Sequence, residues 1–165
     1  MVKITALTNE PTPVAADLVV IVDDVAVTPI SKKATIGNIL KAKPEHIGIA
    51  LGDESTVLAA ASTTVPVTTF HMPYGFTLTD VKAGLTVAGT GAALVTVDIH
   101  EAGTTVLSTK ITIDASEKTS TTAATPPVIS DSALAEDSLI EVFVDLVDTD
   151  NVAAGLKVYL IGTQT

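Results

Sequence analysis

Residues 93–101 read Ala-Leu-Val-Thr-Val-Asp-Ile-His-Glu, and apolar and polar side chains alternate through the centre of this stretch. The apolar set is Val95, Val97 and Ile99, and the polar set is Thr96, Asp98 and His100. Because a β-strand directs successive side chains to opposite faces of its sheet, this alternation predicts a strand that packs its aliphatic face and turns its polar face to solvent. The stretch therefore indicates an antiparallel sheet that covers a core on one side.

Similar short apolar stretches lie on both sides of this strand, with turn residues such as Gly89-Thr90-Gly91 and Ala102-Gly103 between them. Further strands are expected over residues 67–72, 76–87, 105–108, 110–113, 139–147 and 156–161. Residues 139–147 are largely apolar on both faces, which is typical of a strand in the middle of a sheet. The Thr-rich segment 119–127 is expected to cross between sheets, as in Greek-key and jelly-roll folds. The predicted fold class is all-β, an antiparallel β-sandwich of jelly-roll-like type.

The first 52 residues are expected to form an N-terminal hairpin plus one short helix. Leu18–Val22 is a continuous apolar run, Asp23-Asp24 is expected to turn the chain, and Val25–Thr28 is the expected second strand, ended by Pro29. Thr35 is suited to cap a helix from Ile36 to about Lys41, and Pro44 would stop that helix. Residues 53–64 are expected to be a linker, with a short strand considered at 57–61, and residues 65–165 the sandwich domain.

A hairpin and one short helix bury too little area to be stable alone, so the N-terminal segment is expected to dock on a partner. The expected attachment and oligomer contacts are Leu18, Val20 and Val22 on the hairpin and Ile36, Ile39 and Leu40 on one helix face. Lys32 and Lys33 are also proposed to dock against acidic groups. Ordinary solvated lysines on a turn are an equally good interpretation of that pair.

The composition narrows the classes of partner. Apolar residues make up 47% of the 165 residues, charged residues only 17%, and the formal net charge is −10. So acidic a chain is expected to bind neither nucleic acid nor anionic lipid, because both need clustered cations. No apolar run is long enough to span a bilayer, the first residues lack the apolar core of a signal peptide, and cysteine is absent. So apolar a chain is expected to bury part of its surface between subunits.

The sequence offers little chemistry. His46, His71 and His100 lie in different segments without the spacing of a zinc site, and no nucleophile elbow or phosphate-binding loop occurs. Asp145, Asp148 and Asp150 were weighed as calcium ligands, but the characteristic calcium-loop pattern is missing and a solvated acidic loop is the preferred interpretation. With no tryptophan, stacking of a sugar ring is weakly supported. The chain is expected to be no enzyme and to need no metal or other cofactor.

Two parts of the sequence resemble bacteriophage virion proteins. Residues 4–7, 17–23 and 28–40, including Lys32-Lys33-Ala34-Thr35-Ile36 and Asn38-Ile39-Leu40, resemble a short attachment segment that recurs at the start of phage fibre and appendage proteins. Residues 72–81, 97–110 and 131–142 are similar to a β-sandwich of phage surface proteins, including minor structural, fibre and decoration proteins. The resemblance implies a virion structural protein, typically a homotrimer, and it carries over no catalytic residue.

The expected function is therefore structural. The chain is expected to lie on the virion surface as a capsid decoration (cement) protein or a fibre-type appendage, after assembly in the cytoplasm of the infected bacterium. Its expected partners are other copies of itself, as a homotrimer, and virion proteins such as capsid or tail components. The alternative is a receptor-binding module whose sandwich loops recognise a host-surface glycan or protein.

Overall fold

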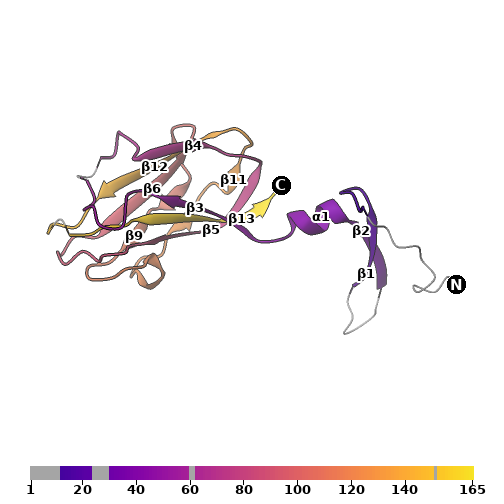
Figure 1. The fold of residues 1–165 in the computed structure, drawn as a ribbon, viewed down its shortest axis with the longest axis horizontal. Helices are drawn as coiled ribbons and strands as arrows, with labels where there is room; N and C mark the ends of the chain where they lie inside the picture. Colours follow the sequence, from indigo (N-terminus) through magenta and orange to yellow (C-terminus); the bar gives the residue numbers. More distant parts are fainter. Residues whose placement is uncertain (1–11, 24–29, 60–61, 151) are drawn as a thin grey trace. The chain divides into compact units, whose positions relative to one another are not determined.

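The computed structural model describes residues 12–23, 30–59, 62–150 and 152–165, with the backbone alone at 21–23, 30 and 31. The chain divides into two compact units, Met1–Lys43 (unit 1) and Pro44–Thr165 (unit 2), both visible in Figure 1. The division falls before the expected linker at 53–64. Strand β3 (Glu45–Ala50) pairs with the last strand of the chain, so residues expected in the N-terminal segment belong to the sheet of unit 2.

Unit 1 contains a two-stranded antiparallel sheet and a short helix. Strand β1 (Leu18–Asp23) pairs with β2 (Ile30–Thr35), in a register that runs from Leu18 opposite Thr35 to Asp23 opposite Ile30. Helix α1 (Ile36–Lys41) follows at once, and the Thr35 hydroxyl accepts a hydrogen bond from the Asn38 amide at 3.1 Å. The predicted helix and its N-cap are thus confirmed.

The second strand of the hairpin was predicted wrongly. The partner of β1 is β2, and the expected strand Val25–Thr28 lies outside the described residues. Asp23 belongs to β1 rather than to the turn. Strand propensity pointed to the other segment, because Val25–Thr28 is mostly β-branched whereas β2 contains Lys32 and Lys33. In the structure, all six residues of β2 pair with β1. The last of them, Thr35, is also the N-cap of the helix.

Unit 2 is built almost entirely of short strands. They are β3, β4 (Thr68–His71), β5 (Phe76–Gly84), β6 (Val95–Glu101), β7 (Thr104–Thr105), β8 (Leu107–Thr109), β9 (Ile111–Ile113), β10 (Val128–Ile129), β11 (Ala133–Leu134), β12 (Leu139–Leu146) and β13 (Lys157–Gln164). The strands expected over 67–72, 76–87, 93–101, 110–113, 139–147 and 156–161 agree with these to within a few residues, and the strand expected over 105–108 falls on two short strands, β7 and β8. Strands β3, β10 and β11 were not predicted. Of the strand considered at 57–61, residues 60 and 61 lie outside the described residues, and Val57 makes only an isolated bridge with Ala154. A 3₁₀ turn (Ser120–Thr122) interrupts the expected crossover.

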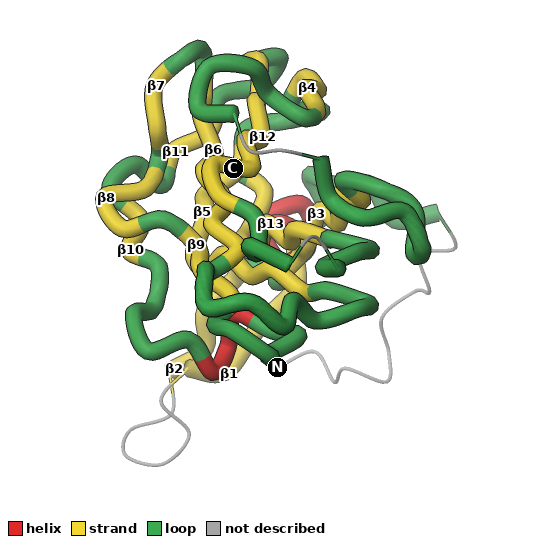
Figure 2. Tube along the Cα trace, turned by 90° about the vertical axis from the view of Figure 1, so that its left-hand side faces the viewer, coloured by secondary structure: helices red, strands yellow, loops and turns green. Residues whose placement is uncertain are grey.

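The long strands form two antiparallel sheets. One has the order β11-β5-β13-β3, and the other has the order β4-β12-β6-β7, with β9 also paired to β6. As expected, β12 is an interior strand, because β4 and β6 flank it. Side chains of both sheets, among them Val97, Ile99, Val158 and Leu160, belong to one buried cluster. Figure 2 shows the strands of unit 2 gathered around this core.

The alternation in β6 is confirmed on its inner face and needs correction on its outer face. Val95, Val97 and Ile99 are buried, as predicted. Asp98, predicted to face solvent, has only 3% of its surface exposed. Asp98 is buried because neighbouring side chains cover its carboxylate. Thr105 and Lys110 contact it from neighbouring segments, and His100 contacts it from the same strand.

Candidate functional site

The hairpin residues expected to contact a partner are open to solvent in a single chain. Leu18 is 58% exposed and Val20 74% exposed, and both lie on the same face of β1 because they are two residues apart. Val22 belongs to the same face of β1 and pairs with Ser31, but its side chain lies outside what the structure describes. Val19, on the opposite face of the strand, is also exposed.

The helix likewise leaves its apolar side uncovered. Ile36 is half-buried, whereas Ile39 and Leu40 are exposed, and no residue of α1 is buried. Backbone hydrogen bonds hold the helix to the chain before β1: the Ile36 amide donates to Asp17 O at 2.9 Å, and the Gly37 amide to Ala15 O at 2.8 Å. The structure thus brings the hairpin and helix residues into one unit whose described part has no core of its own.

We call this exposed set the unit 1 surface. It consists of Val14, Leu18, Val19, Val20, Ile39 and Leu40. Sequence reasoning found all of these except Val14 and Val19. Val14 lies in the turn that ends at Asp17, where the Asp17 carboxylate accepts the Val14 amide at 2.8 Å, and no periodic pattern marks that segment. These side chains lie on both faces of the hairpin strand, on the helix and in the turn before β1, and apolar side chains left exposed on a small unit are typical of an interface.

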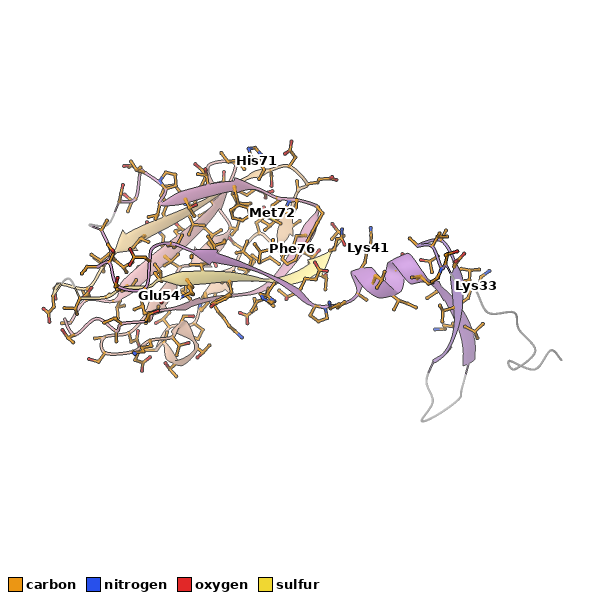
Figure 3. The ribbon with its side chains drawn as sticks, in the orientation of Figure 1. Lys33, Lys41, Glu54, His71, Met72 and Phe76 are labelled. Atoms are coloured by element: carbon orange, nitrogen blue, oxygen red, sulfur yellow. The ribbon has the colours of Figure 1, made fainter. Side chains whose placement is uncertain are left out.

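The two lysines expected to dock lie on opposite faces of the hairpin. Lys33 is opposite Val20 and Lys32 is opposite Ile21, so only Lys33 shares a face with Leu18 and Val20. Both are exposed, and Figure 3 places Lys33 on the hairpin and Lys41 on the helix. Residues 30–43 contain four lysines and no acidic residue. Unit 1 therefore combines exposed aliphatic side chains with a basic segment.

A second group of polar side chains lies on the outer face of β6 and was missed as a group by sequence reasoning. The Asp98 carboxylate accepts a hydrogen bond from the Thr105 hydroxyl at 2.6 Å and another from the backbone amide of Ile99, the next residue in the chain, at 2.9 Å. Lys110 Nζ lies 3.0 Å from the same carboxylate and also forms an ion pair with Asp145. The only signal in the sequence was the i, i+2 spacing of Asp98 and His100, which puts both on one face.

These contacts set the ionisation of the group. Burial raises the pKa of Asp98, but hydrogen bonds from Thr105, Lys110 and His100 together outweigh it and hold that pKa below its ordinary value. The ion pair with Asp145 raises the pKa of Lys110 above its usual range, against the opposing influence of burial. The His100 ring packs on Phe143 with centroids 4.5 Å apart. The arrangement holds a charged pair in place and stabilises the sheet.

Replacing Asp98 by asparagine is expected to destabilise the protein at pH 7 by about 1–3 kcal/mol, since it removes the charge that faces Lys110. Because the folded pKa of Asp98 lies below its unfolded value, its contribution is present above about pH 4 and is lost as the pH falls through the folded pKa. Urea unfolding of both proteins at pH 7 and pH 3 checks this. If the free energy of unfolding of the variant falls below that of the unmodified protein by the same amount at pH 7 and at pH 3, the prediction is contradicted.

The aspartates considered as calcium ligands have separate protein partners. Asp145 pairs with Lys110, the buried Asp148 carboxylate accepts the Val152 and Ala153 amides at 3.1 and 3.2 Å, and Asp150 accepts the Thr90 hydroxyl at 2.9 Å. In the part of the chain that the structure describes, no three His, Cys, Asp or Glu side chains are grouped to hold a metal ion. These aspartates therefore order the loop after β12.

The melting temperature is accordingly expected to stay the same when EDTA or millimolar calcium is added. A bound cation would stabilise the folded state in proportion to the logarithm of its concentration, whereas these three carboxylates already have separate partners in the described part of the chain. Differential scanning calorimetry with and without calcium checks this expectation. A rise of several degrees with calcium, reversed by EDTA, would contradict it.

The remaining sequence-predicted groups do not come together. His46 lies on β3, His71 lies on β4 with its Nδ1 2.8 Å from Asp137 O, and His100 lies on β6. Within residues 12–23, 30–59, 62–150 and 152–165, no helix is long and apolar enough to cross a membrane. Comparison with known proteins gives no relative: no protein-family model, curated protein or solved structure matches this chain.

Proposed function

We propose that this chain is a structural protein of the bacteriophage virion surface, a capsid decoration (cement) protein or a fibre-type appendage. The observation that carries the proposal is the unit 1 surface, whose aliphatic side chains are left uncovered because the described part of the unit has no core to bury them. Unit 1 attaches the chain and joins its copies as a homotrimer, and unit 2 is displayed on the particle.

The strand order of unit 2 supports a jelly-roll-like sandwich. The first strand of the unit pairs with the last (β3 with β13), the second with the penultimate (β4 with β12), and the third with β11. Such nested pairing is what results when one long hairpin folds over into two sheets. Jelly rolls are used in viral capsid and lectin domains, among others, so the fold agrees with the proposal without fixing it.

The chemistry of the chain supports a role in contacts rather than catalysis. The charged groups that form ion pairs, such as Asp98 with Lys110, hold strands and loops together. A net charge of −10 disfavours nucleic acid as a partner, so we propose capsid or tail proteins and sister copies as partners, without insertion into a membrane. Assembly in the cytoplasm of the infected bacterium, followed by release on the virion surface, completes the proposal.

Immunogold labelling of phage particles whose genome encodes the chain tests this function. An antibody raised against unit 2 is expected to label intact particles at regular positions on the capsid or on an appendage. Label confined to the cell fraction would contradict the proposal. The purified chain is also incubated with host cells and applied to a glycan array, since binding there instead of to particles would support the receptor-binding alternative.

A further inference from the structure

Charge is unevenly divided between the two units. Unit 1 contains five lysines and four acidic residues, a net charge of +1, whereas unit 2 contains four lysines and fifteen acidic residues, a net charge of −11. The described residues 30–43 are the most basic part of the chain, with Lys33, Lys41 and Lys43 exposed. Two surfaces of opposite charge in one polypeptide are able to attract each other between copies.

Unit 2 has its own uncovered apolar area, where three loops meet at one end of the sheets. Their described parts are residues 51–59, 62–67, 85–94, 147–150 and 152–156, which lie at the left end of unit 2 in Figure 1. The loops hold one another: the Leu58 amide donates to Ala153 O at 2.8 Å, and both Val57 and Val87 form bridges with Ala154. Thr90 donates to Asp150 at 2.9 Å. We call these connected, described parts of the three loops the platform.

The platform exposes aliphatic side chains that a single chain leaves open. We call Val57, Val67, Val87, Leu94, Leu146 and Val152 the loop-end surface; all six are exposed. Val57 and Val67 also line a hollow of about 180 Å³, whose floor includes Leu51, Leu58 and Val144. The hollow is similar in size to a cavity that holds one small apolar molecule, so one or two aliphatic side chains of a partner fit it.

The loops that carry this apolar area are acidic. The three loops contain Asp53, Glu54, Asp148 and Asp150 and no lysine. Asp148 is buried, whereas Asp53, Glu54 and Asp150 are exposed, and only Glu54 has a lysine partner, Lys157 at 2.5 Å. The loops at this end thus combine exposed aliphatic side chains with exposed carboxylates, which complements the apolar and basic character of unit 1.

We propose that the loop-end surface of one copy receives unit 1 of a second copy. The contact joins two different surfaces, so each chain uses its unit 1 on one neighbour and its loop end on the other, and three such contacts close a ring. This inference rests on the proposed function only in taking unit 1 as the element of association. It adds the surface to which that element binds.

A complementation experiment tests the pairing, using the full chain throughout. One variant carries Val20→Asp and Leu40→Asp in unit 1, and the other carries Val57→Lys and Val67→Lys in the loop end. Each alone is expected to be monomeric, with association at least about a hundredfold weaker, because each lacks one side of every contact. Mixed in equal amounts, they are expected to form a dimer of twice the chain mass, since one intact contact remains.

Controls keep the outcome unambiguous. Val128→Lys changes a valine that is similarly exposed but lies on β10, outside both surfaces, and is expected to assemble like the unmodified chain. Circular dichroism and thermal unfolding check that each variant is folded. If the variant with Val57→Lys and Val67→Lys does not fold, Val152→Lys is used as the loop-end variant instead.

The result that overturns the inference is assembly of the loop-end variant by itself. That outcome means that unit 1 binds another unit 1 or a different surface, and it leaves the proposed function standing. An unmodified chain that is monomeric, or a mixture that forms no dimer, also overturns the inference. The particle labelling decides the proposed function separately from any of these results.

Discussion

Aspartate at positions 20 and 40 is expected to reduce the protein to single chains at concentrations where the unmodified protein is oligomeric. Val20 and Leu40 are the most exposed side chains of the unit 1 surface, at 74% and 61%. An interface loses the transfer free energy of both side chains and gains two carboxylates that must be desolvated, so association weakens by roughly two to three orders of magnitude. Sedimentation velocity across a concentration series measures the change.

The same substitutions are expected to leave unit 2 intact, which makes the result specific. The buried cluster consists of side chains from unit 2 alone, and no described residue of unit 1 belongs to it. The melting temperature of unit 2, followed by circular dichroism, should therefore fall only by the amount that the loss of association itself causes. Val128→Asp is the matched control, and it should remain oligomeric. Unchanged association of the double variant would contradict the role given to the unit 1 surface.

Replacement of Phe76 by alanine is expected to destabilise unit 2 by about 3–5 kcal/mol, because it opens a cavity where β5 meets β13. Phe76 is completely buried in the core, and its ring packs against the backbone of Gly162, where a Cβ would lie only 2.6 Å from the ring. The neighbouring β13 therefore cannot easily move in to fill the space. Guanidinium unfolding, followed by far-ultraviolet circular dichroism, measures the loss.

Phe70→Ala provides the comparison for this prediction. Phe70 lies on the edge strand β4, is only partly buried and packs against the rim of the same core. Phe70→Ala should lower the free energy of unfolding clearly less than Phe76→Ala does, because solvent already reaches part of the Phe70 ring. Equal losses at the two positions, or a loss below about 1 kcal/mol at Phe76, would show that the core is not packed as described.

The sequence was sufficient for the elements in which local and tertiary preferences agree. The alternation of Val95, Val97 and Ile99 predicted β6 and its buried face correctly, and the apolar character of 139–147 predicted an interior strand. Thr35 followed by the Ile36, Ile39, Leu40 pattern predicted the helix to the residue. In these segments, period, capping and composition all favour the same structure.

Features that depend on contacts between distant residues could not be predicted. The burial of Asp98 results from Lys110 and Thr105, which approach from other segments, whereas the strand's own alternation assigns Asp98 to solvent. The partner of β1 was misassigned because the residues of Val25–Thr28 favour a strand more than those of β2, which include Lys32 and Lys33, so propensity alone points away from the observed pairing. Likewise β3 joins unit 2 through pairing with β13, more than a hundred residues later in the chain. Of the expected attachment residues with described side chains, all except the half-buried Ile36 are exposed, and their contact with a partner remains a prediction.

The most direct test of the account is the mass of the purified, unmodified chain in solution. If the apolar surfaces of unit 1 and of the loop end are covered by sister copies, light scattering at micromolar concentration should give three times the 16.8 kDa mass of one chain. A particle that stays at the mass of a single chain over the whole concentration range would show that these side chains remain in water, and it would contradict the account.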